Sequence, residues 1–180
     1  MPTVVSREDY FDTALRVLAR SGFPQLNIRG MCGALGVSTG SFYHHFGGWN
    51  GFVAALLAHW ELRQKHILHS MRFGDGTTED DIVALRTLTL GLPHAAEAAI
   101  RTWAISNPLV ETAQRRVDQA RYDTVRAALA RIVGSEESAR VLATLGMSML
   151  VGFQQLLADG EESELDTLLD RFVQLVYLHA

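Results

Sequence analysis

The chain has 180 residues, of which 48% are hydrophobic and 20% are charged, and its formal net charge is −4. This composition allows a buried core and excludes a disordered chain. No apolar run reaches the roughly 18 to 20 residues of a membrane span, the N-terminus has no apolar leader segment, and Cys32 is the single cysteine. We therefore expect a cytoplasmic protein, one compact domain or one domain with a small appendage, without disulfides or a cysteine-based zinc site.

Charge is unevenly distributed along the chain. Residues 1–70 carry six basic and four acidic side chains, whereas residues 71–180 carry ten basic and sixteen acidic ones. A mildly basic N-terminal third on an acidic body is compatible with an anionic partner for the first part alone.

Apolar residues recur at helical spacing almost throughout, and no segment alternates with the period of a strand. The pattern predicts an all-α fold of about nine helices, with three short ones in the first 46 residues and longer ones after them. Glycine- and proline-containing segments mark the expected helix ends, at 22–24, 36–38, 47–48, 74–76, 91–93, 107–108, 134–135 and 159–160.

Residues 27–46 carry the most specific pattern in the chain. Asn27 can cap a short helix that ends at Gly36, and Ser38 can cap a second helix that runs from Thr39 to about Phe46. Two short capped helices joined by a tight turn predict a helix-turn-helix, whose second helix enters the major groove of DNA.

The exposed face of that second helix is predicted to carry hydroxyls and imidazoles, while Phe42 and Phe46 pack inward with Leu35 and Val37. We assign phosphate contacts, besides those of backbone amides, to Arg29, Tyr43 and His45. We assign base discrimination to Thr39, Ser41 and His44. The complete set of predicted DNA-binding residues is Asn27, Arg29, Ser38, Thr39, Ser41, Tyr43, His44 and His45.

A family resemblance rests on one motif of this segment, Gly36-Val37-Ser38-Thr39-Gly40-Ser41-Phe42-Tyr43-His44-His45-Phe46. The motif resembles the N-terminal DNA-binding domain of TetR-type (TetR/AcrR) transcriptional regulators, and the resemblance extends over roughly residues 7–60. It implies a three-helix DNA-binding domain over residues 1–50 and a helical-bundle domain for ligand binding and dimerisation over residues 51–180. It also implies a homodimer whose C-terminal helices pair, and a pocket whose ligand changes the affinity for DNA.

The sequence departs from the family pattern at two places. Trp49 and Asn50 stand where the pattern has a lysine followed by an acid. Because that lysine commonly contacts a phosphate, its loss should reduce the steepness of the plot of log binding constant against log salt concentration by about 0.9. Gly30 and Gly33 lie within the short first helix of the motif, where each costs roughly 1 kcal/mol relative to alanine.

The last two predicted helices have broad apolar faces and contain the small residues Ala143, Gly146 and Gly152. We expect them to form a four-helix interface with a second copy of the chain. A two-fold dimer places its recognition helices about 34 Å apart and so favours a palindromic site.

Several polar-tipped or aromatic side chains fall on apolar segments of the body, as expected for a small-molecule pocket. The predicted pocket residues are Arg86, His94, Trp103, Tyr122, Met147 and Gln154. A ligand held there would shift the helix that runs from Gly48 to about Arg72 and move the recognition helices out of register.

These features predict a ligand-responsive transcriptional regulator that binds operator DNA as a homodimer, with repression as the commoner outcome in the family. The alternative is a helical ligand-binding or scaffold protein without DNA binding, which Trp49 favours. We expect no enzymatic activity, no cofactor and no metal. The segment from Gly36 to Gly40 matches a hydrolase elbow but lacks the preceding strand, and His66 and His69 share a helix face without further metal ligands.

Overall fold

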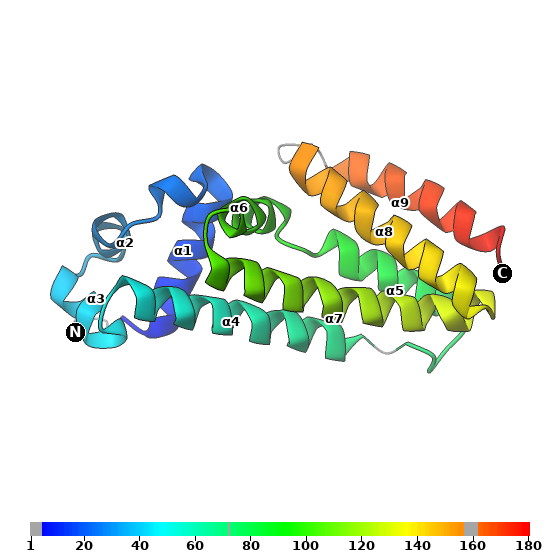
Figure 1. The fold of residues 1–180 in the computed structure, drawn as a ribbon, viewed down its shortest axis with the longest axis horizontal. Coiled ribbons are helices and arrows are strands. Elements are labelled where there is room, and N and C mark those ends of the chain that lie inside the picture. The colour runs from blue at the N-terminus through cyan, green and yellow to red at the C-terminus, as the bar shows by residue number, and fades with distance from the viewer. Residues whose placement is uncertain (1–4, 72, 157–161) are drawn as a thin grey trace. The chain divides into compact units, whose positions relative to one another are not determined.

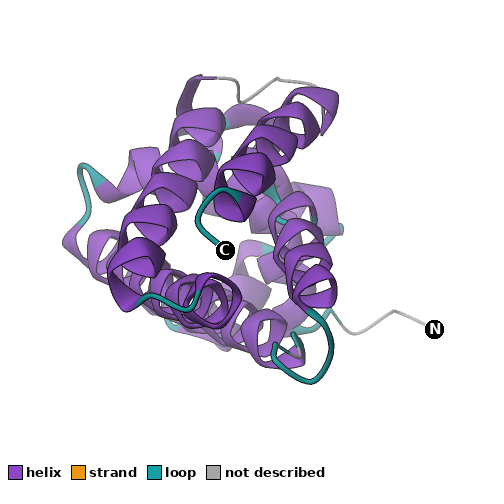
Figure 2. Cartoon of the chain, turned by 90° about the vertical axis from the view of Figure 1, so that its right-hand side faces the viewer, coloured by secondary structure: helices purple, strands orange, loops and turns teal. Residues whose placement is uncertain are grey.

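The computed structural model of the chain describes residues 5–71, 73–156 and 162–180. Within these ranges the chain forms nine α-helices and one short 3-10 helix and contains no strand, which confirms the predicted all-α fold (Figures 1 and 2). The elements in chain order are α1 (Arg7–Ser21), η1 (Phe23–Gln25), α2 (Ile28–Leu35), α3 (Thr39–Phe46), α4 (Trp49–Ser70), α5 (Thr78–Leu90), α6 (His94–Ala104), α7 (Pro108–Val133), α8 (Glu136–Leu156) and α9 (Glu162–Tyr177).

Two helices begin with a capping box, in which a hydroxyl and a carboxylate satisfy free backbone N–H groups. At the start of α1 the N–H of Asp9 donates to the hydroxyl of Ser6 at 3.2 Å, and the N–H of Ser6 donates to the carboxylate of Asp9 at 2.7 Å. Thr77 and Asp80 make the same pair of bonds at the start of α5, at 3.2 and 2.8 Å. Short-range interactions therefore determine where these two helices begin.

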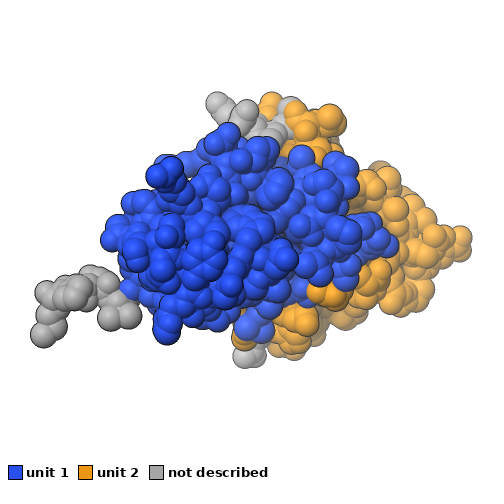
Figure 3. Space-filling view, turned by 60° about the vertical axis from the view of Figure 1, so that its left-hand side comes forward, with its two compact units in different colours: residues 1–63, 93–115 blue, residues 64–92, 116–180 orange. Residues whose placement is uncertain are grey.

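The chain divides into two compact units, which Figure 3 distinguishes. The first contains Met1–Arg63 and Pro93–Arg115, and the second contains Gln64–Leu92 and Arg116–Ala180. In the first unit α6 packs on α1, and the ring of Trp103 on α6 stacks on the ring of Phe23 with centroids 4.5 Å apart. The division of the chain at residue 50 into DNA-binding and ligand-binding parts stays a prediction.

The core of the second unit is built by α5, α7, α8 and α9. Its central side chains are Leu129, Leu142 and Val176, which are buried between these helices together with two alanines of α8. α8 and α9 lie side by side and contact each other, and α9 also contacts α5 (Figure 1). This arrangement encloses the cavity described below. None of the described helices combines the length and the apolar character that crossing a membrane requires.

Candidate nucleic-acid interface

The N-terminal helices of the first unit enclose a small aromatic core. The ring of Tyr10 meets the ring of Phe42 edge-on with centroids 5.8 Å apart, and it meets the ring of Phe46 in the same way at 5.4 Å. Phe52 of α4 closes the cluster, 5.3 Å from Phe42 and 5.1 Å from Phe46. Because Phe42 and Phe46 belong to α3, their burial determines which face of α3 turns outward.

The helix α2 has the predicted start and end. The N–H of Gly30 donates to the side-chain oxygen of Asn27 at 2.8 Å, which confirms Asn27 as the cap. At the other end Gly36 has a φ of 67°, and the N–H of Val37 donates to the carbonyl of Cys32 at 3.0 Å. A left-handed glycine followed by this bond is a common helix end and produces the tight turn toward α3. Cys32 itself is buried, as expected for a core thiol.

The cap of α3 differs from the prediction. Ser38 occupies the N-cap position with an extended backbone, but its hydroxyl makes no capping hydrogen bond. The reason lies in the main chain, where the N–H of Ser41 donates to the carbonyl of Ser38 at 3.1 Å. This bond tightens the first turn and uses the N–H that a capping hydroxyl would otherwise accept. The expectation that the Ser38 hydroxyl caps this helix was therefore wrong.

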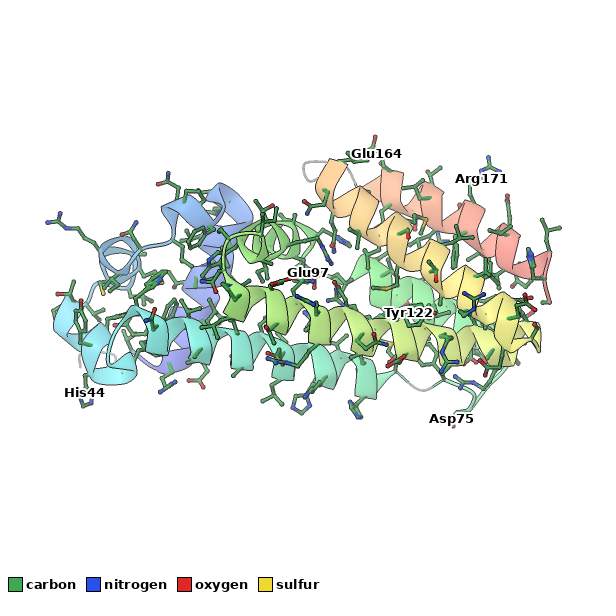
Figure 4. The ribbon with its side chains drawn as sticks, viewed as in Figure 1. His44, Asp75, Glu97, Tyr122, Glu164 and Arg171 are labelled. Carbon is green, nitrogen blue, oxygen red and sulfur yellow. The ribbon has the colours of Figure 1, made fainter. Side chains whose placement is uncertain are left out.

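The outward face of α3 is formed by Thr39, Tyr43 and His44. Tyr43 is 52% exposed, and Thr39 and His44 are also exposed. His44 projects away from the helices of its unit (Figure 4). Hydroxyls and imidazoles on an exposed short helix are groups that can donate to phosphates or meet base edges.

Ser41 and His45 are half-buried and face α1. The hydroxyl of Tyr10 donates to the hydroxyl of Ser41 at 3.2 Å, and the ring centroid of His45 lies 5.6 Å from that of Tyr10. The guanidinium of Arg7 donates to the carbonyl of His45 at 3.0 Å and lies 4.8 Å from the ring centroid of Phe46. Two side chains of α1 thus hold α3, one near its start and one in its last turn.

The remaining predicted contact residues lie on or next to α2. Asn27 is exposed, yet both ends of its amide are used locally, because its NH₂ group donates to the carbonyl of Gln25 at 3.0 Å while its oxygen caps the helix. Arg29 is exposed in the first turn of α2. Unlike the amide of Asn27, the guanidinium of Arg29 takes no part in the helix cap. Its positive charge is of the kind that binds phosphates.

Three residues that position α3 were not found from the sequence. Tyr10 and Arg7 follow the helical spacing of the apolar residues of α1, so this spacing could have indicated them. Gly51 is the third, because a Cβ at this position would clash with the carbonyl oxygen of Phe46. The close approach of α4 to the end of α3 therefore requires glycine there. No pattern in the sequence indicates this contact.

Trp49 stands where the family pattern has a lysine. It is the first residue of α4, its side chain is half-buried, and its ring centroid lies 5.5 Å from that of Phe52. The indole therefore packs against the aromatic core that also holds α3. At this position the chain has a packing contact in place of a cation.

A cavity lies within the second unit and holds about 730 Å³ of empty space when its open mouth is counted. Two of the six predicted pocket residues, Arg86 and Met147, line it. Tyr122 packs beside the neighbouring core cluster, Gln154 is buried on α8, and Trp103 and His94 belong to the first unit. Apart from Arg86 the polar lining consists of Thr89 and Arg121. In the described part of the chain no three His, Cys, Asp or Glu residues are grouped so that they could hold a metal ion.

The two short helices α2 and α3, the left-handed turn between them and the outward polar face of α3 define a helix-turn-helix protein of the all-α class. Residues 11–56 match the family model described as bacterial regulatory proteins, tetR family. The N-terminal segment is therefore similar to that of the tetR family, and the chain has the fold of solved TetR-family transcriptional regulators.

Solved structures with this fold are similar over nearly the whole chain. A transcriptional regulator from Rhodococcus sp. Rha1 is 21% identical with a TM-score of 0.79, covering 96% of each chain. A TetR transcriptional regulator from Legionella pneumophila is 12% identical with a TM-score of 0.80, covering 97% of this chain and 99% of the other. A protein from Saccharomonospora viridis in complex with choline is 22% identical with a TM-score of 0.69, covering 93% and 95%. No curated protein matches the chain in sequence.

Proposed function

We propose that this chain is a ligand-responsive transcriptional regulator that binds a palindromic operator as a homodimer. In this proposal the bound regulator represses transcription. The observation that carries the proposal is the orientation of α3. Phe42 and Phe46 are buried on one side, and Thr39, Tyr43 and His44 are exposed on the other. A helix held in this way can enter a major groove with its polar face toward the bases. Such a regulator acts on DNA in the cytoplasm.

Contacts to phosphates supply most of the affinity in this proposal, and contacts to bases supply the specificity. Backbone amides, Arg29, Tyr43 and His45 are assigned to phosphates, and Asn27 and Ser38 belong to the proposed interface without an assigned kind of contact. Thr39, Ser41 and His44 are assigned to base edges. The exposure of Arg29 and Tyr43 supports their roles, whereas the half-buried Ser41 and His45 would contact DNA only with the part of their surface that α1 leaves open.

Homodimerisation through α8 and α9 is supported by apolar side chains that these helices expose. Val141, Leu145 and Leu156 are exposed on α8, and Leu168 and Tyr177 are exposed on α9. Exposed apolar side chains on two adjacent helices are typical of a surface that pairs with a second copy. Measuring the molecular mass in solution of the wild-type protein and of a Leu145→Glu variant tests this homodimer. A wild-type protein that is monomeric at micromolar concentration would contradict it.

The ligand in this proposal occupies the cavity of the second unit and acts by binding one arrangement of the helices more tightly than the other. A coupling of about 1–3 kcal/mol between two binding sites is typical of allosteric proteins. α4 is the proposed connection, because its residues contribute to both units. The choline complex of the structural neighbour from Saccharomonospora viridis supports a small molecule as effector.

The DNA-binding half is tested by fluorescence anisotropy on the duplex that flanks the protein's own gene, with a scrambled duplex for comparison. Palindrome-dependent binding that falls at least about tenfold in His44→Ala is the expected result. His66→Ala is the matched control, because His66 is an exposed histidine of α4 outside the proposed interface. Equal losses in the two variants would contradict the assignment of His44. Equal binding of all duplexes by wild-type protein would favour the alternative, a helical ligand-binding or scaffold protein.

A further inference from the structure

The first residue of α1 brings a positive charge to the last turn of α3. Nη1 of Arg7 donates to the carbonyl of His45 at 3.0 Å, and the guanidinium lies 4.8 Å from the ring centroid of Phe46. His45 and Phe46 are the last two residues of α3, and Arg7 precedes His45 by 38 residues in the sequence. The end of the helix that is proposed to enter the major groove therefore has a cation from another helix beside it.

This cation compensates an end of α3 that would otherwise disfavour an anion. The last carbonyls of an α-helix have no partner within the helix and give that end a partial negative charge. In α3 the carbonyl of Tyr43 accepts from the N–H of Gly47 at 2.8 Å, and the carbonyl of His45 accepts from Arg7. The guanidinium thus satisfies one of these carbonyls and places a full positive charge next to it.

The guanidinium of Arg7 can serve a second acceptor besides the carbonyl of His45. Arg7 is exposed, and a guanidinium carries five N–H donors in a planar fork that suits the oxygens of a phosphate. The bond through Nη1 occupies only part of this fork. The carboxylate of Asp9, two residues further along α1, accepts from the N–H and the hydroxyl of Ser6 at 2.7 and 2.8 Å. Glu8 points about 100° further around the helix.

The last turn of α3 lies where a phosphate is expected in the proposed complex with DNA. A recognition helix meets base edges mainly with its N-terminal residues, and the phosphates border the groove. The last turn of α3 is therefore nearer to the rim of the groove than Thr39 is. Trp49, which follows this turn, contributes an indole that packs on Phe52. At this end of α3 a phosphate would therefore meet the guanidinium of Arg7.

We propose that Arg7 is a phosphate-binding residue of the DNA interface. Its guanidinium donates to a backbone phosphate at the end of α3 while it holds the carbonyl of His45. A phosphate contact carries no base preference, so Arg7 contributes to the affinity for every duplex and not to the choice among them. This inference rests on the proposed function, because it assigns a further contact to the same DNA interface.

A matched pair of variants tests the contact. Arg7→Gln and Arg63→Gln each remove one positive charge and keep an N–H donor. Arg63 is an exposed residue of α4, fourteen residues after its start and so about 21 Å along its axis. This length exceeds the Debye length of about 10 Å at 0.1 M salt.

Fluorescence anisotropy at several salt concentrations measures the binding of each variant to the duplex that flanks the gene and to the scrambled duplex. The slope of log binding constant against log salt concentration counts the phosphate contacts. Arg7→Gln should reduce the steepness of this slope by about 0.9 on both duplexes, and Arg63→Gln should leave it unchanged. Urea unfolding checks that each variant is folded.

Arg7→Lys separates the charge of Arg7 from its effect on the position of α3. Lysine keeps the charge but loses the planar fork, so the slope should stay close to that of the wild-type protein. Equal reductions in Arg7→Gln and Arg7→Lys would assign the effect to the position of α3 and overturn the inference. This comparison does not depend on the control at Arg63.

The remaining outcomes distinguish the inference from the proposed function. An unchanged slope in folded Arg7→Gln, or the same reduction in Arg63→Gln, overturns the inference and leaves the proposed function intact. Weaker binding of the flanking duplex alone, with an unchanged slope, would show that Arg7 only positions α3, which also overturns it. Wild-type protein that binds neither duplex would contradict the proposed function and the inference together.

Discussion

The hydroxyl of Tyr10 on α1 donates a hydrogen bond to the hydroxyl of Ser41 on α3 across 3.2 Å. Burial raises the pKa of Tyr10 because it disfavours the phenolate, so the side chain keeps the proton that it donates. Ser41 thereby uses one of its lone pairs within the protein. The bond opposes rotation of α3 about its own axis. Such a rotation would move Thr39 and His44 relative to the major groove of a DNA duplex bound as proposed.

Tyr10→Phe, Ser41→Ala and the double variant form a cycle that tests this relationship. Each single change should lower the free energy of unfolding by about 0.5–1.5 kcal/mol and weaken operator binding. If Ser41 acts through Tyr10, the double variant should bind DNA about as well as either single variant. Additive losses would instead assign Ser41 an independent contact with DNA. In the unfolding measurement, Tyr43→Phe is a control for loss of a hydroxyl without loss of this bond, because it removes an exposed hydroxyl from the same helix.

Alanine at the two glycines near the end of α2 should have opposite effects. Gly33 lies inside the helix and a Cβ there would meet no atom within 4 Å, so Gly33→Ala should raise the free energy of unfolding by about 0.4–1 kcal/mol. Gly36 has a φ of 67°, so Gly36→Ala should lower it by about 1–2 kcal/mol. Urea unfolding of the two variants measures both effects. A stabilising Gly36→Ala would contradict the left-handed turn.

The capping box of α5 makes stability depend on pH in the acidic range. The backbone N–H of Thr77, followed by its hydroxyl, holds the pKa of Asp80 below its usual value of 3.8. A carboxylate whose pKa is lower in the folded state stabilises the fold above the unfolded value and loses this contribution as the pH falls below it. Asp80→Asn should therefore lower the melting temperature at pH 7, and the difference from wild type should shrink below about pH 3.8.

The neighbouring acid of the same helix turn is the control for this pH dependence. Glu79 also lies in the first turn of α5 but is not part of the capping box. Glu79→Gln should change the melting temperature less than Asp80→Asn does. A pH-independent difference between Asp80→Asn and the wild-type protein would count against the capping box.

The ion pairs of Arg86 should contribute more to stability than an ordinary surface pair. Arg86 of α5 pairs with Asp166 and Asp170 of α9, and its side chain is 28% exposed. The hydrogen bond to Asp170 is the main cause that raises the pKa of Arg86. Arg86→Met should lower the free energy of unfolding by about 1 kcal/mol. Arg115→Met breaks an exposed pair with Glu111 within one helix and should cost less. Equal effects in urea unfolding would contradict a special role of Arg86.

Short-range chemistry determined much of the fold of this protein in a way that the sequence reveals. Asn27 caps α2 and Gly36 ends it because each acts on backbone groups within a few residues. The burial of Phe42 and Phe46 follows the period of the helix, so the outward face of α3 could also be predicted. Ser38 is the exception, because a tightened first turn of the main chain replaces its side-chain cap.

Only the tertiary structure decided which side chains, polar or aromatic, meet partners that are distant in the sequence. Ser41 meets Tyr10, which lies 31 residues away in the sequence. Arg86 meets Asp170 across 84 residues, and Trp103 stacks on Phe23. These pairs depend on how helices pack, and a side chain at a given helical position can serve a core, a cavity or a surface. Local periodicity therefore determines the helices and their faces, whereas the packing of the helices determines what each face meets.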